Sequence, residues 1–101
     1  MRKFGLIGKT LTHSFSKTFF TAYFEKEKIE AHYSTFELNE IEEISSLLNS
    51  KTVSGLNVTI PYKQSVIPFL DELSAEAQAI GAVNVIQFKE GKTIGHNSDA
   101  F

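Results

Sequence analysis

The sequence contains no cysteine, and this absence excludes several kinds of chemistry. Without thiols the chain can form no disulfide, no thiolate zinc site and no cysteine nucleophile. A chain without cysteine also fits a reducing compartment, where disulfides are rare. We therefore expect a cytoplasmic protein.

Long apolar runs and blocks of like charge are absent as well. No stretch approaches the ~18 apolar residues of a membrane span. The apolar run at the N-terminus ends at Lys9 and is too short for the core of a signal peptide. The net charge is −2 and the pI is about 5.9, so the chain offers no clustered basic face. We expect neither nucleic acid nor a membrane as a partner.

The sequence also lacks the spacings that mark a metal site or a dinucleotide site. His13, His32 and His96 do not have the spacing of metal ligands. Gly5 and Gly8 do not form the G-x-G-x-x-G turn that holds a pyrophosphate. We therefore predict no metal ligand and no cofactor-binding residue in these 101 residues.

What the chain does contain is enough for one compact domain. It has 101 residues, of which 42% are hydrophobic, and nine of these are phenylalanines. A chain of this size buries about 65% of its unfolded surface when it folds. We therefore predict a single domain with one core and no need for disulfides or metal.

The order of apolar runs and helical periodicities predicts an α/β fold. Short apolar runs predict strands at residues 4–7, 31–36, 55–60, 82–88 and 93–96. Periodicity and capping residues predict helices at residues 15–28, 39–48, 61–67 and 75–80. This alternation favours a three-layer sandwich with a mainly parallel sheet. Residues 89–92 should close a C-terminal hairpin that adds one antiparallel strand.

Four local details follow from the same patterns. The first helix should present one apolar stripe, formed by Phe15, Phe19, Ala22 and Tyr23. Asn39 with Glu42 resembles a capping box that starts the second helix. In the third strand one side should carry Leu56, Val58 and Ile60, and the other Asn57 and Thr59. Pro61 lies where a first helical turn would tolerate it.

Polar residues gather where the strands end. Ligands of open α/β sheets bind beyond the carboxyl ends of the strands. The polar side chains at or near those ends are His13, Ser14, Ser16, Asn57, Thr59, Lys63, Asn84, Asn97, Ser98 and Asp99. Hydroxyls, carboxamides, an ammonium and a carboxylate in one crevice would suit a small polyhydroxylated acid.

Each of these residues also has a structural interpretation. Ser14 and Ser16 could only cap a helix, and Asn84 could be a satisfied buried amide. Lys63 could be an exposed helix lysine, and Asp99 could cap a following helix.

Four short patterns, taken in order, resemble the shikimate dehydrogenase family. Residues 13–16 resemble its H-S-x-S segment, and residues 57–63 match its N-V-T-x-P-x-K segment completely. Residues 81–84 match G-A-V-N, and residues 95–99 match G-x-N-T-D with Ser98 in place of threonine. The resemblance covers essentially the whole chain. It departs from the family at Lys17 (usually proline), at residues 20–21 (commonly His-Asn) and at Val85 (commonly threonine).

The resemblance implies an oxidoreductase of aromatic amino-acid biosynthesis. Members of the family interconvert 3-dehydroshikimate and shikimate, usually with NADPH. Residues 1–101 would form the N-terminal substrate-binding domain, and the Rossmann domain that binds NADP in the family would be absent. We therefore expect these residues alone to bind no NADP and to transfer no hydride.

The resemblance also assigns roles to six residues. Ser14 and Ser16 would bind the substrate carboxylate, and Thr59, Asn84 and Asp99 would bind ring hydroxyls. Lys63 and Asp99 would form the catalytic pair. A protonated lysine beside a ketone oxygen can stabilise the charge that hydride addition leaves there and can supply the proton. Which member of the pair transfers the proton stays open.

Three alternatives stay open beside this interpretation. The chain could come from a quinate/shikimate dehydrogenase of broader specificity, with NAD in place of NADP. It could be a non-catalytic module that senses shikimate-like acids. It could also be a small α/β interaction domain whose polar residues only cap helices. In the shikimate dehydrogenase interpretation, the surface that faces the second domain in the family would be exposed, which favours a homodimer.

Overall fold

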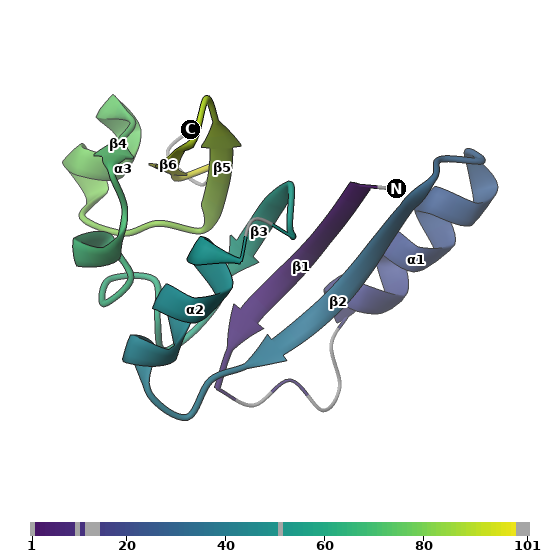
Figure 1. Cartoon of the computed structure of the whole chain (residues 1–101), viewed down its shortest axis with the longest axis horizontal. Coiled ribbons are helices and arrows are strands. Elements are labelled where there is room, and N and C mark those ends of the chain that lie inside the picture. The colour runs from purple at the N-terminus through teal and green to yellow at the C-terminus, as the bar shows by residue number, and fades with distance from the viewer. Residues whose placement is uncertain (1, 10, 12–14, 51, 99–101) are drawn as a thin grey trace.

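The centre of the molecule is a six-stranded sheet in the order β2-β1-β3-β5-β6-β4. The computed structural model describes residues 2–9, 11, 15–50 and 52–98, with the backbone alone at residues 15 and 16. The strands are β1 (Arg2–Gly8), β2 (Ala31–Glu37), β3 (Gly55–Val58), β4 (Glu72–Leu73), β5 (Val85–Lys89) and β6 (Lys92–His96). Figure 1 shows β1, β2 and β3 side by side, with the β5–β6 hairpin beyond β3.

One strand of the sheet runs against the others. β5 is antiparallel to both β3 and β6, whereas the pairs β1–β2, β1–β3 and β4–β6 are parallel. The mainly parallel sheet with one antiparallel strand from the hairpin is confirmed. Because β5 is reversed, its first residue lies at the edge where β1, β3 and β6 end. We call this edge of the sheet the carboxyl rim.

Helices cover both faces of the sheet, which confirms the three-layer prediction. They are α1 (Phe15–Lys26), α2 (Ile44–Asn49) and α3 (Ala75–Ile80), with 3-10 helices η1 (Ile41–Glu43) and η2 (Ile67–Phe69). Adjacent residues of β1 point to opposite faces. Leu6 packs in the cluster that includes aromatic rings of α1. Ile7 belongs to the larger core that contains Ile44 of α2 and Ala77 of α3. No helix in the described part of the chain is both long and apolar enough to cross the bilayer.

The predicted apolar stripe of α1 is wrong at the three residues whose side chains the structure describes, and the side chain of Phe15 lies outside that part. Phe19 and Tyr23 are 50% and 44% exposed, and Ala22 is exposed as well. The rings that pack against the sheet are those of Phe20 and Phe24, and Phe20 stacks on Tyr33 of β2 at 4.9 Å. Since α1 carries aromatic residues on two adjoining sides, the i, i+4 spacing fits either side. The contact with Tyr33 distinguishes them.

The second helix starts one residue later than predicted. The Glu40 N–H donates to Glu43 Oε2 at 3.0 Å, so the capping pair is Glu40 and Glu43 and not Asn39 and Glu42. The first turn is the 3-10 helix η1, and α2 follows it. The capping box is therefore of the predicted kind but is displaced in register.

The predicted helix over residues 61–67 is also wrong. β3 ends at Val58, Ile60 is 75% exposed, and the Ile60–Pro61 peptide bond is cis. The next residues form turns, with η2 only at Ile67–Phe69. Tertiary bonds explain the difference: the Lys63 carbonyl accepts from Val83 N–H at 2.7 Å, so it is not available to a helix.

Tyr62 anchors the same segment from inside the larger core. Its ring is buried and its hydroxyl donates to the Leu38 carbonyl. Burial raises the pKa of the Tyr62 hydroxyl, and the carboxylates of Glu40, Glu43 and Glu42 raise it further. The hydroxyl therefore stays protonated and remains a donor in neutral solution.

The third helix and the hairpin agree with prediction. Ser74 caps α3 by accepting a bond from Ala77 N–H at 3.1 Å, and Gly81 ends it with φ 76°. Glu90 and Gly91 both have positive φ, at 52° and 79°, which is the geometry of a two-residue hairpin turn. The two-residue strand β4, which pairs with β6, was not predicted.

Candidate functional site

Backbone hydrogen bonds bring four separate segments together at the carboxyl rim. Thr59 N–H donates to the Ile7 carbonyl at 2.9 Å, which continues the contact between β1 and β3. Val58 N–H donates to the Asn84 carbonyl at 2.8 Å, and Asn84 N–H donates to the His96 carbonyl at 3.0 Å. Asn84 therefore lies between the ends of β3 and β6, directly before β5 begins.

Lys63 joins this rim through the turn that follows β3. Because its carbonyl accepts from Val83 N–H, residue 63 lies beside the segment that carries Asn84. The lysine is partly buried. Its ammonium forms no hydrogen bond or ion pair with any residue that the structure describes. A positive charge at the rim is thus available to an anionic or carbonyl oxygen.

Two asparagines fasten the end of β6 to the segment before β5. Asn84 Nδ2 donates to Ser98 Oγ at 2.9 Å, and Ser98 N–H donates to Asn84 Oδ1 at 3.0 Å. Asn97 is buried, and its Nδ2 donates to the Ala82 carbonyl at 3.1 Å. Part of the role of Asn84 is therefore structural, as one of the sequence interpretations allowed.

The structure brings together only some of the predicted site residues. The backbone bonds above place the segments that carry Thr59, Lys63 and Asn84 next to one another at the rim. Ser14 and Asp99 lie outside the described residues, and of Ser16 only its backbone in the first turn of α1 is described. The chain runs from the end of β1 into α1, so α1 begins at the end of the molecule where β1 ends (Figure 1).

One pair of residues near the rim was not predicted. Tyr33 Oη donates to Asn57 Oδ1 at 3.0 Å. The sequence places Asn57 among the polar residues at strand ends without indicating a role for it, and it places Tyr33 within a strand. The alternation in residues 57–59 was the one available signal, because it places Asn57 on the same face as Thr59.

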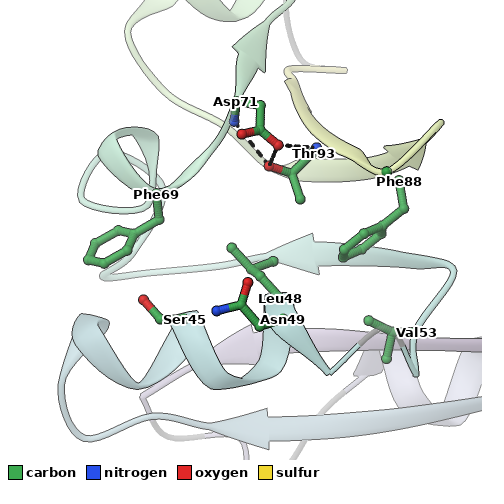
Figure 2. Close-up of a pocket in the computed structure, with 9 residues that line it drawn as sticks. Ser45, Leu48, Asn49, Val53, Phe69, Asp71, Phe88 and Thr93 are labelled. Atoms are coloured by element: carbon green, nitrogen blue, oxygen red, sulfur yellow. Dashed lines mark hydrogen bonds between the residues drawn. The ribbon is translucent and has the colours of Figure 1, made fainter.

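A separate cavity of about 530 Å³ lies away from the rim (Figure 2). Its lining includes Ser45, Leu48 and Asn49 of α2, together with Phe69, Asp71, Phe88 and Thr93. Val53 and Gly91 also line it and lie before β3 and in the hairpin turn, so it is at the opposite end of the strands. A cavity of this volume is a candidate site on its own, but the polar groups at the carboxyl rim favour the rim.

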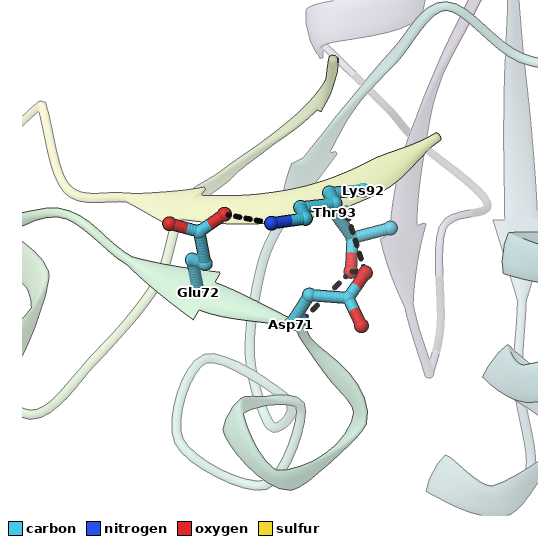
Figure 3. Close-up of polar contacts among 4 residues, drawn as sticks. All are labelled: Asp71, Glu72, Lys92 and Thr93. Carbon is cyan, nitrogen blue, oxygen red and sulfur yellow. Dashed lines mark hydrogen bonds and ion pairs between the residues drawn. The ribbon is translucent and has the colours of Figure 1, made fainter. Parts of the chain in front are cut away.

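Asp71 and Thr93, two of the polar residues that line this cavity, bond to each other (Figure 3). Thr93 N–H and Oγ1 donate to Asp71 Oδ2 at 2.8 and 3.1 Å, and Asp71 N–H donates to Thr93 Oγ1 at 3.0 Å. The exposed ion pair between Lys92 and Glu72, at 3.7 Å, lies next to them. These contacts fasten the short β4 to β6 and explain the polar groups without a ligand. In the described part of the chain, no three His, Asp or Glu side chains are placed to hold a metal.

Comparison with known proteins gives a consistent result. The model of the shikimate dehydrogenase substrate binding domain matches residues 6–86. A shikimate dehydrogenase (NADP(+)) of Pyrococcus abyssi is 46% identical over 99 residues, covering 98% of this chain and 38% of that protein. The one from Staphylococcus epidermidis is 37% identical, covering 96% of this chain and 37% of that protein.

Solved structures agree with the sequence relatives. Shikimate dehydrogenase 1 from Peptoclostridium difficile superposes with a TM-score of 0.91 at 39% identity, covering 98% of this chain and 37% of that one. Shikimate 5-dehydrogenase from Thermus thermophilus was solved in complex with NADP(H) and shikimate. It superposes with a TM-score of 0.89 at 32% identity, covering 98% of this chain and 38% of that one. The chain therefore spans less than two fifths of these proteins.

Proposed function

This chain belongs to the family of shikimate dehydrogenase substrate-binding domains, and from that premise we propose that it binds shikimate and 3-dehydroshikimate for an NADP-dependent dehydrogenase. One observation carries most of the support. Backbone hydrogen bonds bring the segments that carry Thr59, Lys63 and Asn84 to the carboxyl rim, and the Lys63 ammonium has no partner among the described residues. A ring that carries hydroxyls and one oxidisable oxygen would use all three groups.

In the proposed site each residue acts on one part of the substrate. Thr59 and Asn84 bind ring hydroxyls. Ser14 and Ser16 bind the carboxylate, which the start of α1 also favours because helix N-termini attract anions. Lys63 holds a proton at the oxygen of the carbon that changes oxidation state, and Asp99 orients the lysine and binds a neighbouring hydroxyl.

The cofactor is not held by these residues. The sequence has no G-x-G-x-x-G turn, and the described turn after β3 contains no glycine between residues 59 and 66. We therefore propose that NADP is bound outside these residues. The proposal includes a cytoplasmic location and association of two copies through a surface that a second domain would cover.

A titration with shikimate, followed by ¹H–¹⁵N NMR, tests the proposal on this chain. Saturable shifts should concentrate at the amides of Thr59, Lys63 and Asn84 and should leave the cavity beside Asp71 unaffected. Weak binding is still measurable by this method. No saturable shift at millimolar shikimate would refute the proposal and favour an interaction domain.

Two comparisons separate the remaining alternatives. Quinate that binds as tightly as shikimate would indicate the broader quinate/shikimate specificity. A fusion to the part of the Pyrococcus abyssi relative beyond the matched region tests for catalysis. If that fusion binds shikimate but does not oxidise NADPH with 3-dehydroshikimate, the sensor interpretation is favoured.

Gly8→Ala should weaken shikimate binding by displacing Thr59. A Cβ atom at residue 8 would lie 2.7 Å from Thr59 Cγ2 and 2.7 Å from Leu11 Cδ2, which is closer than packed carbon atoms approach. We expect Kd to rise by about 3- to 10-fold, the effect of one lost hydrogen bond, with the NMR shifts at Thr59 reduced.

Gly55→Ala is the matched control for this change. Gly55 lies at the opposite end of β3. A Cβ atom there would lie 3.2 Å from its nearest neighbour, a ring atom of Phe4. The control should keep the parent affinity. Equal affinity for both variants would show that Thr59 does not contact the ligand.

A further inference from the structure

We propose that Tyr33 is a positioning residue of the shikimate site and that it acts through Asn57. The inference rests on the proposed function, because it concerns how that same rim is prepared for its ligand. Tyr33 lies on β2 and Asn57 on β3, and β1 separates the two strands. The bond from Tyr33 Oη to Asn57 Oδ1, at 3.0 Å, therefore spans the middle strand.

The register of the strands explains why a residue as long as tyrosine is needed. Tyr33 is opposite Phe4, and Asn57 is opposite Leu6. Neighbouring strands lie about 4.8 Å apart, so β2 and β3 are separated by roughly 10 Å. The phenol ring crosses this gap over β1, and a shorter side chain at residue 33 would leave the Asn57 carboxamide without this donor.

Packing holds the Tyr33 hydroxyl in one place. The residue is 2% exposed and belongs to the cluster with Leu6 and Leu11. Its ring stacks on Phe20 of α1 at 4.9 Å, with an interplanar angle of 19°. Asn57 is equally well fixed, because β3 pairs with β1 on one side and with β5 on the other.

The bond determines which end of the carboxamide faces a ligand. Tyr33 occupies the Asn57 oxygen, while Asn57 Nδ2 forms no hydrogen bond with any described residue. No buried side-chain nitrogen or oxygen in the described part lacks a partner, so Nδ2 must reach the surface. Asn57 thus presents N–H donors, which would bind a hydroxyl or carboxylate oxygen.

Without the phenol hydroxyl this orientation would no longer be enforced. The terminal torsion of asparagine is broad and roughly two-fold, so the carboxamide could turn its oxygen outward. The competing explanation is purely structural, since a buried hydroxyl needs an acceptor. Under that explanation Tyr33 would contribute to stability and would not affect ligand affinity.

A double-mutant cycle distinguishes the two explanations. The variants are Tyr33→Phe, Asn57→Ala and the combination of both, each titrated with shikimate by NMR and each unfolded with urea. We expect Tyr33→Phe to raise Kd by about 3- to 10-fold, the equivalent of one hydrogen bond. In the Asn57→Ala background the same change should have no further effect on Kd.

Tyr62→Phe is the matched control. Tyr62 is the second buried tyrosine with a hydrogen-bonded hydroxyl in the described chain, and it lies in the other core, where it donates to Leu38. This variant should lose stability, and any rise in its Kd should be smaller than that of Tyr33→Phe, because the Tyr62 hydroxyl does not contact Asn57. The unmutated chain provides a measurement that needs no variant: the Asn57 side-chain NH₂ resonances should shift when shikimate is added.

The outcomes separate this inference from the proposed function. If the parent binds shikimate and Tyr33→Phe binds equally well, Tyr33 has no positioning role and the proposed function stands. Additive losses in the double variant, or unmoved Asn57 NH₂ resonances, would likewise overturn the action through Asn57. If the parent itself shows no saturable binding, both proposals fail.

Discussion

Replacing Lys63 with methionine should lower kcat by about 10²- to 10⁴-fold, the usual contribution of a positioned acid or base. The assay uses the fusion with the part of the Pyrococcus abyssi relative beyond the matched region, with NADPH oxidation by 3-dehydroshikimate as the readout. Methionine keeps the length of the side chain and removes its charge and its proton. Since the ammonium bonds to no described residue, its loss should leave the fold intact.

Two further variants show what the lysine contributes. Lys63→Arg keeps the positive charge but does not release its proton, because the pKa of a guanidinium lies far above neutral pH. It should retain shikimate affinity and still lose turnover. Lys92→Met is the control, since Lys92 is exposed and pairs only with Glu72, and it should keep the parent kcat. If Lys63→Met keeps the parent kcat, the lysine takes no part in the mechanism. If Lys63→Arg is fully active, the lysine only stabilises charge and does not transfer a proton.

Much of the rim was predictable because parallel strands end at one edge. Thr59 and Lys63 follow β3 and were expected there for that reason. Asn84 is at the rim for a different reason. It precedes β5, and the start of an antiparallel strand lies at the edge where its parallel neighbours end. The hairpin in the sequence already implied this reversal.

The errors arose where tertiary contacts outweigh local pattern. Residues 61–67 carry helix signals, yet the Lys63 carbonyl bonds to Val83, twenty residues further along the chain. The two aromatic sides of α1 have the same spacing, and only the position of Tyr33 shows which one packs on the sheet. The Tyr33–Asn57 bond spans 24 residues and a third strand, so no local pattern could indicate it.

The position of Asn84 depends on the position of β5, and β5 is held in the sheet by the burial of its Ile86 side chain. Ile86 is fully buried, lies opposite Leu56 on one side and Gly95 on the other, and belongs to the larger core. It is the central contact between the antiparallel strand and its two neighbours. Loosening it would affect the bonds from Asn84 to Val58 and His96.

Ile86→Ala should therefore lower the free energy of unfolding by about 2–5 kcal/mol, the cost of a cavity at a buried isoleucine. That is a large part of the 5–15 kcal/mol typical of a whole domain. Urea unfolding followed by circular dichroism measures the loss. Ile80→Ala, at a residue that is 47% exposed, is the matched control and should change stability by less than about 0.5 kcal/mol.

If the chain binds shikimate, shikimate at about 100 times Kd should raise the free energy of unfolding of the Ile86→Ala variant by about 2.7 kcal/mol. Equal losses of unfolding free energy in Ile86→Ala and Ile80→Ala would show that the Ile86 contact does not fix β5. Other contacts would then have to hold Asn84 at the rim.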